Sequence, residues 1–230
     1  MAPTKHILPA DRGGELVSGT NYGRVGDAIR AAIVRGTYPP GARLKVQDLS
    51  ALYGISSNPI REALQQLQGE GLVVISPNRG ATVRRIDEKL IRHIYEISEG
   101  LDGIMAGRCA ILASREQLDN LRSIQQQLER AAATNQSGKR MRLNGEFHEY
   151  LGTITGNFEA LDIRRRHQNL IRTIREQYGY APERIEQIHI EHRAIIEAIA
   201  KGGVEEAERA ARFHSVRSRD DILSRFRGFN

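Results

Sequence analysis

The spacing of hydrophobic residues changes near residue 87, and this change predicts two parts with different architectures. Before it, apolar residues recur at helical spacing in short segments and then form two β-branched runs. After it, they recur at helical spacing to the end of the chain, with no further β-rich run. We therefore predict a mainly α protein, with a small mixed part over residues 20–86 and an antiparallel all-α helical bundle over 87–230. Residues 1–19 are polar, and we expect a disordered arm there.

The segment 48–67 predicts two short helices joined by a tight turn. Leu49 and Leu52 give the first helix an apolar edge, and Gly54 ends it by supplying a residue at positive φ. Ser56 or Asn58 can cap the second helix. The inward face of that helix carries apolar residues at helical spacing: Ile60, Ala63, Leu64 and Leu67. Its outer face carries short hydrogen-bonding groups and one cation, which suit base edges and phosphates: Ser57, Asn58, Arg61 and Gln65. An ordinary helical hairpin is the alternative interpretation.

The neighbouring elements extend this hairpin to an N-terminal winged helix-turn-helix. The expected elements are a helix over 22–35, an extended segment over 43–45, and strands over 72–75 and 81–84. The two strands form a β-hairpin with Asn78 and Arg79 at its tip, where an exposed arginine suits a minor groove or a phosphate.

Charge and composition narrow the class of protein. Residues 20–86 hold nine Lys and Arg against four Asp and Glu, so a net charge of +5 out of the total of +6 lies in the part with the helix pair. A basic module of this kind indicates a polyanionic partner. No apolar run is long enough to span a bilayer, no secretory signal is visible and Cys109 is the single cysteine, so we expect a cytoplasmic protein with no membrane partner. The chain has no Gly-rich phosphate loop, no nucleophile elbow and no cysteine pair for zinc.

Four separated motifs in the first part carry a resemblance to a known family. They are Pro-Pro-Gly-Ala-Arg-Leu at 39–44, Gly-Ile-Ser-Ser-Asn-Pro-Ile-Arg-Glu-Ala-Leu at 54–64, Glu-Gly-Leu-Val at 70–73 and Asn-Arg-Gly at 78–80. In this order they resemble the DNA-binding domain of GntR-family transcription regulators. Family members usually carry Arg and Thr at the positions of Ser57 and Asn58, so we expect an operator that differs from the common one. The residues expected to contact DNA are Arg43, Lys45, Gln47, Ser56, Ser57, Asn58, Arg61, Asn78 and Arg79.

The second part contains three histidines in unusual positions. Helices are predicted over 88–113, 115–133, 140–155, 158–179, 181–201 and 204–226. His148, His192 and His214 fall on the inward faces of three different helices, with Asn144 one turn before His148. A single inward histidine is usually a hydrogen-bonded core residue. Three together favour a metal site, and neutral imidazoles suit Zn, Ni, Co or Fe.

This second part resembles the FCD type of effector-binding domain found in the FadR branch of the same family. The resemblance is carried by Phe147-His148, by the run from Glu191-His192 to Gly202-Gly203, and by His214. It implies a divalent metal ion, such as Zn or Ni, bound by Asn144, His148, His192 and His214, with a small organic acid beside it. The family most often has Asp at the position of Asn144, so we expect weaker metal binding here.

The same resemblance bears on the effector. Arg is common at the position of Ser98, where it pairs with a carboxylate. Arg172 and Arg175 are candidate replacements, with solvated surface charges as the alternative. His189, one turn before His192, is a candidate neighbour of the metal site or an ordinary histidine.

We therefore expect a DNA-binding transcription regulator that is not an enzyme. Repression is the commoner mode in the family, so we expect a repressor that binds a double-stranded DNA operator as a homodimer and is controlled by a small organic acid. One alternative is a DNA-binding protein with a purely structural metal. The other is a metal-dependent hydrolase, in which Glu146 or Glu149 acts as the general base.

Overall fold

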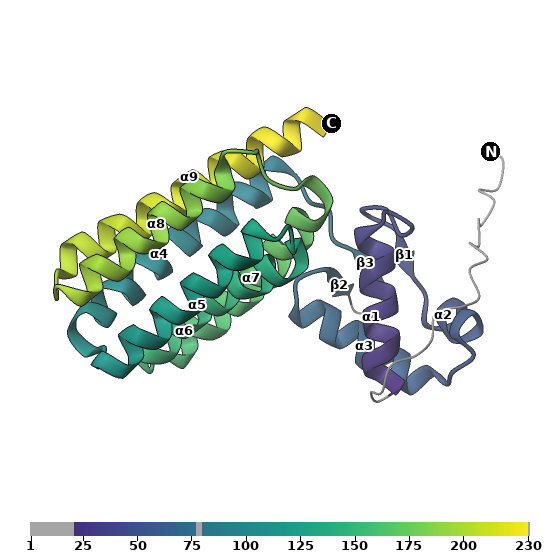
Figure 1. The fold of residues 1–230 in the computed structure, drawn as a ribbon. Coiled ribbons are helices and arrows are strands. Elements are labelled where there is room, and N and C mark those ends of the chain that lie inside the picture. The colour runs from purple at the N-terminus through teal and green to yellow at the C-terminus, as the bar shows by residue number, and fades with distance from the viewer. Residues whose placement is uncertain (1–20, 77–79, 230) are drawn as a thin grey trace. The chain divides into compact units, whose positions relative to one another are not determined.

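The computed structural model describes residues 21–76 and 80–229. The chain divides into two compact units, Met1–Arg85 and Ile86–Asn230, each described by itself below (Figure 1). The arm predicted over 1–19, and Asn78 and Arg79 at the predicted wing tip, lie outside the described residues. In the described part of the chain, no helix is both long and apolar enough to cross a membrane.

The first unit contains the predicted winged helix-turn-helix. Its elements are α1 (Asn21–Val34), β1 (Arg43–Leu44), α2 (Val46–Tyr53), α3 (Ser57–Gly69), β2 (Val73–Ser76) and β3 (Gly80–Val83). The three strands form an antiparallel sheet in the order β1-β3-β2, with Leu44 opposite Ala81. Gly54 ends α2 at φ 66°, and its N–H donates to the Ser50 carbonyl, as the turn between α2 and α3 requires.

An apolar core fixes α3 within this unit. Ile60, Ala63, Leu64 and Leu67 are buried on the inward face of α3, as predicted. The exposure of Leu52 differs from the prediction, and the predicted cap of α3 is confirmed only in its position. Leu52 is 41% exposed, because α2 is short and buries only Leu49. Ser56 takes the N-cap position of α3, but its side chain makes no capping hydrogen bond.

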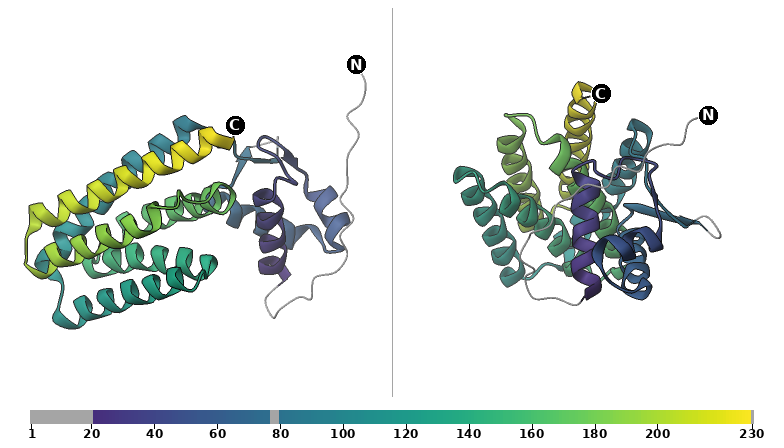
Figure 2. Two further views of the ribbon diagram at one scale, coloured as in Figure 1. Left: turned by 45° about the horizontal axis from the view of Figure 1, so that its top comes forward. Right: turned by 90° about the vertical axis from the view of Figure 1, so that its right-hand side faces the viewer.

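The second unit is a bundle of long helices. They are α4 (Glu88–Leu112), α5 (Arg115–Ala133), α6 (Ser137–Thr155), α7 (Phe158–Tyr178), α8 (Arg184–Ala200) and α9 (Val204–Phe229). α4, α8 and α9 pack together on one side of the bundle, and α5, α6 and α7 on the other (Figures 1 and 2). α6 begins three residues earlier than predicted. α8 begins three residues later than predicted, and the Ala181 N–H in the preceding turn donates to Asp221 Oδ1.

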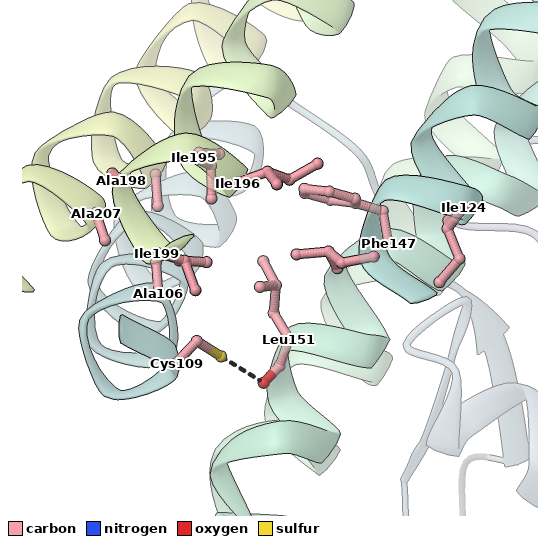
Figure 3. Packing of buried hydrophobic residues seen from close by; sticks show 12 residues of the cluster. Ala106, Cys109, Ile124, Phe147, Leu151, Ile195, Ile196, Ala198, Ile199 and Ala207 are labelled. Atoms are coloured by element: carbon pink, nitrogen blue, oxygen red, sulfur yellow. Dashed lines mark hydrogen bonds between the residues drawn. The ribbon is translucent and has the colours of Figure 1, made fainter. Parts of the chain in front are cut away.

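A hydrophobic cluster holds the two sides of the bundle together and borders the histidines (Figure 3). Phe147 on α6 is fully buried and stacks on the His192 ring, with centroids 3.9 Å apart and the rings nearly parallel. At the far end of the cluster the Cys109 thiol donates to the Leu151 carbonyl. Burial raises the pKa of Cys109 to about 12, so the thiol stays protonated and acts as a small core residue.

Candidate DNA-binding surface and metal centre

The outer face of α3 carries the side chains expected to contact DNA. Asn58, Arg61 and Gln65 are exposed and Ser57 is half-buried, all opposite the apolar face of the helix. Ser56, directly before α3, is exposed. Arg43 on β1, Lys45 directly before α2 and Gln47 in its first turn are also exposed. These groups are free to meet a partner, and their contact with DNA remains a prediction.

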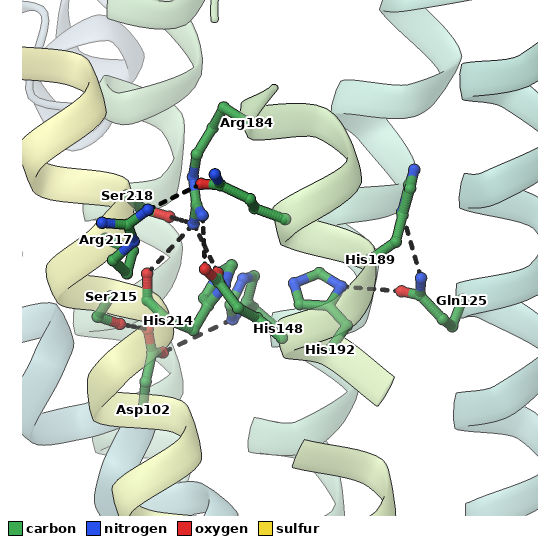
Figure 4. Close-up of polar contacts among 12 residues, drawn as sticks. Asp102, Gln125, His148, Arg184, His189, His192, His214, Ser215, Arg217 and Ser218 are labelled. Carbon is green, nitrogen blue, oxygen red and sulfur yellow. Dashed lines mark hydrogen bonds and ion pairs between the residues drawn. The ribbon is translucent and has the colours of Figure 1, made fainter. Parts of the chain in front are cut away.

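The three predicted histidines converge in the middle of the bundle. His148 on α6, His192 on α8 and His214 on α9 are all buried, and each has a ring nitrogen within 4.8 Å of one from the other two (Figure 4). We call these three residues the His cluster. The helical spacing of inward positions on separate helices was therefore sufficient to predict this convergence.

Gln125 on α5 orients His192. Its Oε1 lies 2.9 Å from His192 Nδ1, and its Nε2 donates to Glu129 Oε1 at 2.8 Å. A carboxylate only accepts hydrogen bonds, so Glu129 fixes which end of the Gln125 amide is the oxygen. His192 must then donate from Nδ1, which leaves the lone pair of Nε2 pointing to the His cluster. Nε2 is buried and has no hydrogen-bond partner.

Gln125 also contacts a second histidine, His189 on α8. His189 Nδ1 lies 3.3 Å from Gln125 Nε2 and accepts from it, so His189 is linked to the His cluster through Gln125. Burial, followed by the neighbouring His214 and His189, lowers the pKa of His192 well below its usual value.

Glu191 and Arg184 orient His214 from the opposite side. His214 Nδ1 donates to Glu191 Oε2 at 2.7 Å, and Arg184 binds both oxygens of that carboxylate at 2.6 and 2.7 Å. Burial alone would raise the pKa of Glu191, but the hydrogen bonds from His214 and Arg184 lower it below its usual value. The carboxylate therefore stays charged and keeps the proton of His214 on Nδ1, so that Nε2 is free to bind a cation.

Asp102 on α4 faces His148. Its Oδ1 accepts from Arg164 Nε at 2.6 Å and its Oδ2 accepts from Ser215 Oγ at 2.7 Å, so both oxygens are already used. His148 Nδ1 lies 3.8 Å from Oδ1, beyond hydrogen-bond distance, and has no hydrogen-bond partner. Burial, followed by the positive charge of Arg164, lowers the pKa of His148 well below its usual value.

The donor set of the His cluster fits a divalent metal ion. Three imidazoles lie close together, and the low pKa values of His148 and His192 keep those two neutral. Neutral imidazole nitrogens are ligands for Zn²⁺ and Ni²⁺, and hydrogen-bonded outer groups such as Gln125 and Glu191 are the usual supports of histidine ligands. Three protein ligands leave coordination positions for a fourth group.

The other predicted residues line one small cavity beside the His cluster. Asn144, Ser98, Arg172 and Arg175 all contribute to its wall, together with His148 and His214. Ser98 is buried and its Oγ has no hydrogen-bond partner. Their roles in binding a metal or an effector remain predictions.

Arg175 is buried, so the alternative interpretation of a solvated surface charge is wrong for this residue. It is 3% exposed, makes an ion pair with Asp221, and donates to the Ser218 and Gly179 carbonyls. The side chain of Arg172 is 41% exposed, and its Nε lies 3.9 Å from Glu176 Oε1.

Sequence reasoning missed the buried polar and charged groups that surround the histidines. They are Asp102, Gln125, Arg164, Arg184 and Glu191. A signal was present for two of them: Asp102 lies one turn after Ser98 on the buried face of α4, and Gln125 lies between the inward residues Leu121 and Leu128 of α5. A polar residue at a core position of a helix is unusual and marks a buried hydrogen-bond network.

Comparison with known proteins agrees with this architecture. Residues 21–83 match the family described as bacterial regulatory proteins, gntR family, and residues 93–217 match the FCD domain. An uncharacterized HTH-type transcriptional regulator of Bacillus subtilis, YdhC, is 28% identical over 81% of this chain and 84% of its own length. The HTH-type transcriptional repressor RspR of Escherichia coli is 25% identical over 81% of this chain and 82% of its own length.

Solved structures show the same fold. Escherichia coli McbR/YncC is similar with a TM-score of 0.70 at 15% identity, over 93% of this chain and all of that one. A GntR regulator from Rhodococcus sp. RHA1 is similar with a TM-score of 0.66 at 24% identity, over 88% of this chain and 97% of that one. The relatives are transcriptional regulators and not enzymes. The chain therefore belongs to the GntR family of DNA-binding transcriptional regulators, in the group that carries an FCD domain.

Proposed function

We propose that this protein is a repressor whose operator affinity is controlled by a small organic acid, bound beside a divalent metal ion in the second unit. The observation that carries the proposal is the convergence of His148, His192 and His214 in the interior of a chain that also has a helix-turn-helix. Three imidazoles at such distances are costly to bury without a ligand, because His148 Nδ1 and His192 Nε2 are buried without hydrogen-bond partners.

The exposed side chains of the first unit support sequence-specific binding to DNA. Arg61 and Asn58 project from α3, the helix that enters the major groove in helix-turn-helix proteins. Arg43 on β1 and Lys45 directly before α2 are exposed cations available for phosphates. Two copies of the chain bind two half-sites of a pseudo-palindromic operator.

The exposed face of α4 supports a homodimer. Ile97, Ile104 and Ile111 recur seven residues apart, and they are 48%, 47% and 69% exposed. Seven residues are two helical turns, so the three side chains form one stripe. In an antiparallel pair of α4 helices with Ile104 on the two-fold axis, Ile97 faces the partner's Ile111, so the stripe is complementary to itself. Gly100 lies between the first two isoleucines and has open space around it, which permits close approach of the helices.

Control by the acid follows from where the proposed ligands lie. A bound metal supplies positive charge and an open coordination position for a carboxylate. His148, His192 and His214 belong to three different helices, so a ligand at this site stabilises one packing of α6, α8 and α9 over others. Release from DNA then requires that the acid binds better to the arrangement with mismatched recognition helices.

Operator binding in the presence of metal and acid tests the proposal. DNA fragments selected with the purified full chain supply the operator, and fluorescence anisotropy then measures its affinity with Zn²⁺ or Ni²⁺ and a panel of small carboxylic acids. We expect at least one acid to weaken binding in the metal-loaded protein and to have no effect on a His192→Ala/His214→Ala variant. DNA affinity that no acid changes would instead indicate a purely structural metal.

The dimer has its own test. Ile104→Glu places a charge on the proposed axis and should convert the protein to monomers in analytical ultracentrifugation. Ile163→Glu on α7 is the matched control, because Ile163 is also 46% exposed but lies outside the stripe. Equal masses for the two variants would contradict the α4 interface.

A further inference from the structure

The cavity beside the His cluster is too small to hold an organic acid. Its volume is about 30 Å³, far below the roughly 300–1,000 Å³ that is typical of ligand pockets. It can take an ion or a single small polar group, but not a carbon chain. If an acid binds there, as the proposed function requires, most of the molecule must lie elsewhere.

A second, larger cavity adjoins the first. It lies between α6 and α7, opens to solvent and has a volume of about 440 Å³, within the range of roughly 300–1,000 Å³ that is typical of ligand pockets. The two cavities share part of their walls: Met141, His148, Arg164, Gln168 and Arg172 line both. A molecule that fills the outer cavity therefore borders the His cluster through His148.

The outer cavity offers a guanidinium to an anion. Arg164 is committed to Asp102 at 2.6 Å, and Arg165 to Glu149 at 2.6 Å. Arg172 has a weaker partner, Glu176 at 3.9 Å, and its side chain is 41% exposed. Because Arg172 also lines both cavities, it is the cation best placed to bind an acidic group at the outer end of a ligand.

We propose that the effector is an acid with a carboxylate at each end of a short carbon chain, and that it occupies both cavities. One carboxylate lies in the inner cavity beside the His cluster, where Ser98 Oγ is a hydrogen-bonding group without a partner. The carbon chain lies between α6 and α7, and the second carboxylate binds Arg172 in the outer cavity. The gap between these two helices is also the route by which the acid enters.

Gly145 on α6 provides a way to block the outer cavity. It lines this cavity, and a Cβ added to it would meet the Gln168 side chain at 3.5 Å, an ordinary contact. Gly145→Ala is therefore compatible with the fold, and it replaces a helical glycine with a better helix former. Gly145→Phe directs a ring into the same space and fills it.

Binding of defined acids to the Ni²⁺-loaded full chain tests the proposal. The probes are the dicarboxylates malonate, succinate, glutarate and adipate and the monocarboxylates of matching length, measured by titration calorimetry. We expect the best dicarboxylate to bind about tenfold or more tightly than its monocarboxylate, the gain of one charge-assisted hydrogen bond. Gly145→Ala should keep this preference and Gly145→Phe should lose it.

A second variant tests the proposal even if Gly145→Phe fails to fold. Arg172→Met changes a half-exposed side chain and should lower dicarboxylate affinity about tenfold or more, so that the preference over the monocarboxylate is lost. Equal dicarboxylate binding by the Ala and Phe variants, or no preference in the wild type, would overturn the two-cavity site. The proposed function would survive that result if acid binding still required His192 and His214. Failure of every acid to bind the metal-loaded wild type would overturn both.

Discussion

The two units of this protein place their polar groups in opposite ways. In the described part of the chain, every buried polar or charged side chain lies in the second unit, between Ser98 and Ser215. The buried side chains of the first unit are apolar, and Arg61 and Asn58 project from its surface. A rigid apolar core is sufficient to present a surface to DNA, whereas a site for an ion or small molecule needs polar groups held inside. The two kinds of site should therefore respond differently to mutation.

Breaking the buried ion pair of Arg184 should have the largest effect on stability. Arg184→Met leaves the Glu191 carboxylate buried without its bidentate partner, and we expect the free energy of unfolding to fall by about 3–5 kcal/mol. Urea unfolding followed by circular dichroism measures it. The control is Arg209→Met, because the ion pairs of Arg209 with Glu205 and Glu206 are exposed. In this variant the free energy of unfolding should fall by less than about 1 kcal/mol. Similar losses in both variants would show that the interior network contributes no more than a surface pair.

Metal binding should stabilise the second unit through the His cluster. At a free Zn²⁺ or Ni²⁺ concentration of about 100 times the Kd, we expect the free energy of unfolding to rise by about 2.7 kcal/mol. The His192→Ala/His214→Ala variant should show no rise. His93→Gln is the control, because His93 is an exposed residue of α4 outside the cluster. A rise in the double variant equal to that of the wild type would place the metal elsewhere.

Replacing Arg61 should weaken DNA binding without changing stability. We expect Arg61→Ala to cost about 1–3 kcal/mol of operator affinity, measured by fluorescence anisotropy at fixed salt. Because Arg61 is exposed, the free energy of unfolding should change by less than about 0.5 kcal/mol. Gln68→Ala, at an exposed position near the end of α3, is the control. Unchanged operator affinity for Arg61→Ala would remove this residue from the interface.

Acid should destabilise the metal-free second unit through His148 and His192. Their pKa values in the folded state lie well below the unfolded value of 6.5, so below pH 6.5 the unfolded chain binds more protons and stability falls as pH falls. Each histidine contributes a slope of up to about 1.4 kcal/mol per pH unit. Urea unfolding between pH 7 and pH 5 measures it, and His192→Leu should reduce the slope by the share of one histidine. A slope unchanged in that variant would contradict the buried, neutral state of His192.

Local patterns were sufficient to predict the elements of both units. The turn at Gly54 and the inward face of α3 depend on residues close in sequence, and they were predicted as observed. The convergence of the three histidines followed from their inward positions on separate helices. The prediction that Leu52 packs inward was wrong, because apolar spacing in a short helix does not show which side of the helix the rest of the unit covers.

Contacts between distant residues were beyond sequence reasoning. Gln125 orients His192 across 67 positions, and Arg175 pairs with Asp221 across 46. Such partners depend on how the helices are rotated against one another, which spacing along a single helix does not determine. The buried state of Arg175 and the role of Glu191 therefore became visible only in the folded bundle.

The metal content of the purified full chain tests the central claim most directly. After saturation with Zn²⁺ or Ni²⁺ and dialysis against metal-free buffer, elemental analysis should find a single ion per chain in the wild type. The His192→Ala/His214→Ala variant should retain none, while the His93→Gln control should match the wild type. An equal metal content in the double variant and the wild type, or none in either, would contradict a metal centre at the His cluster.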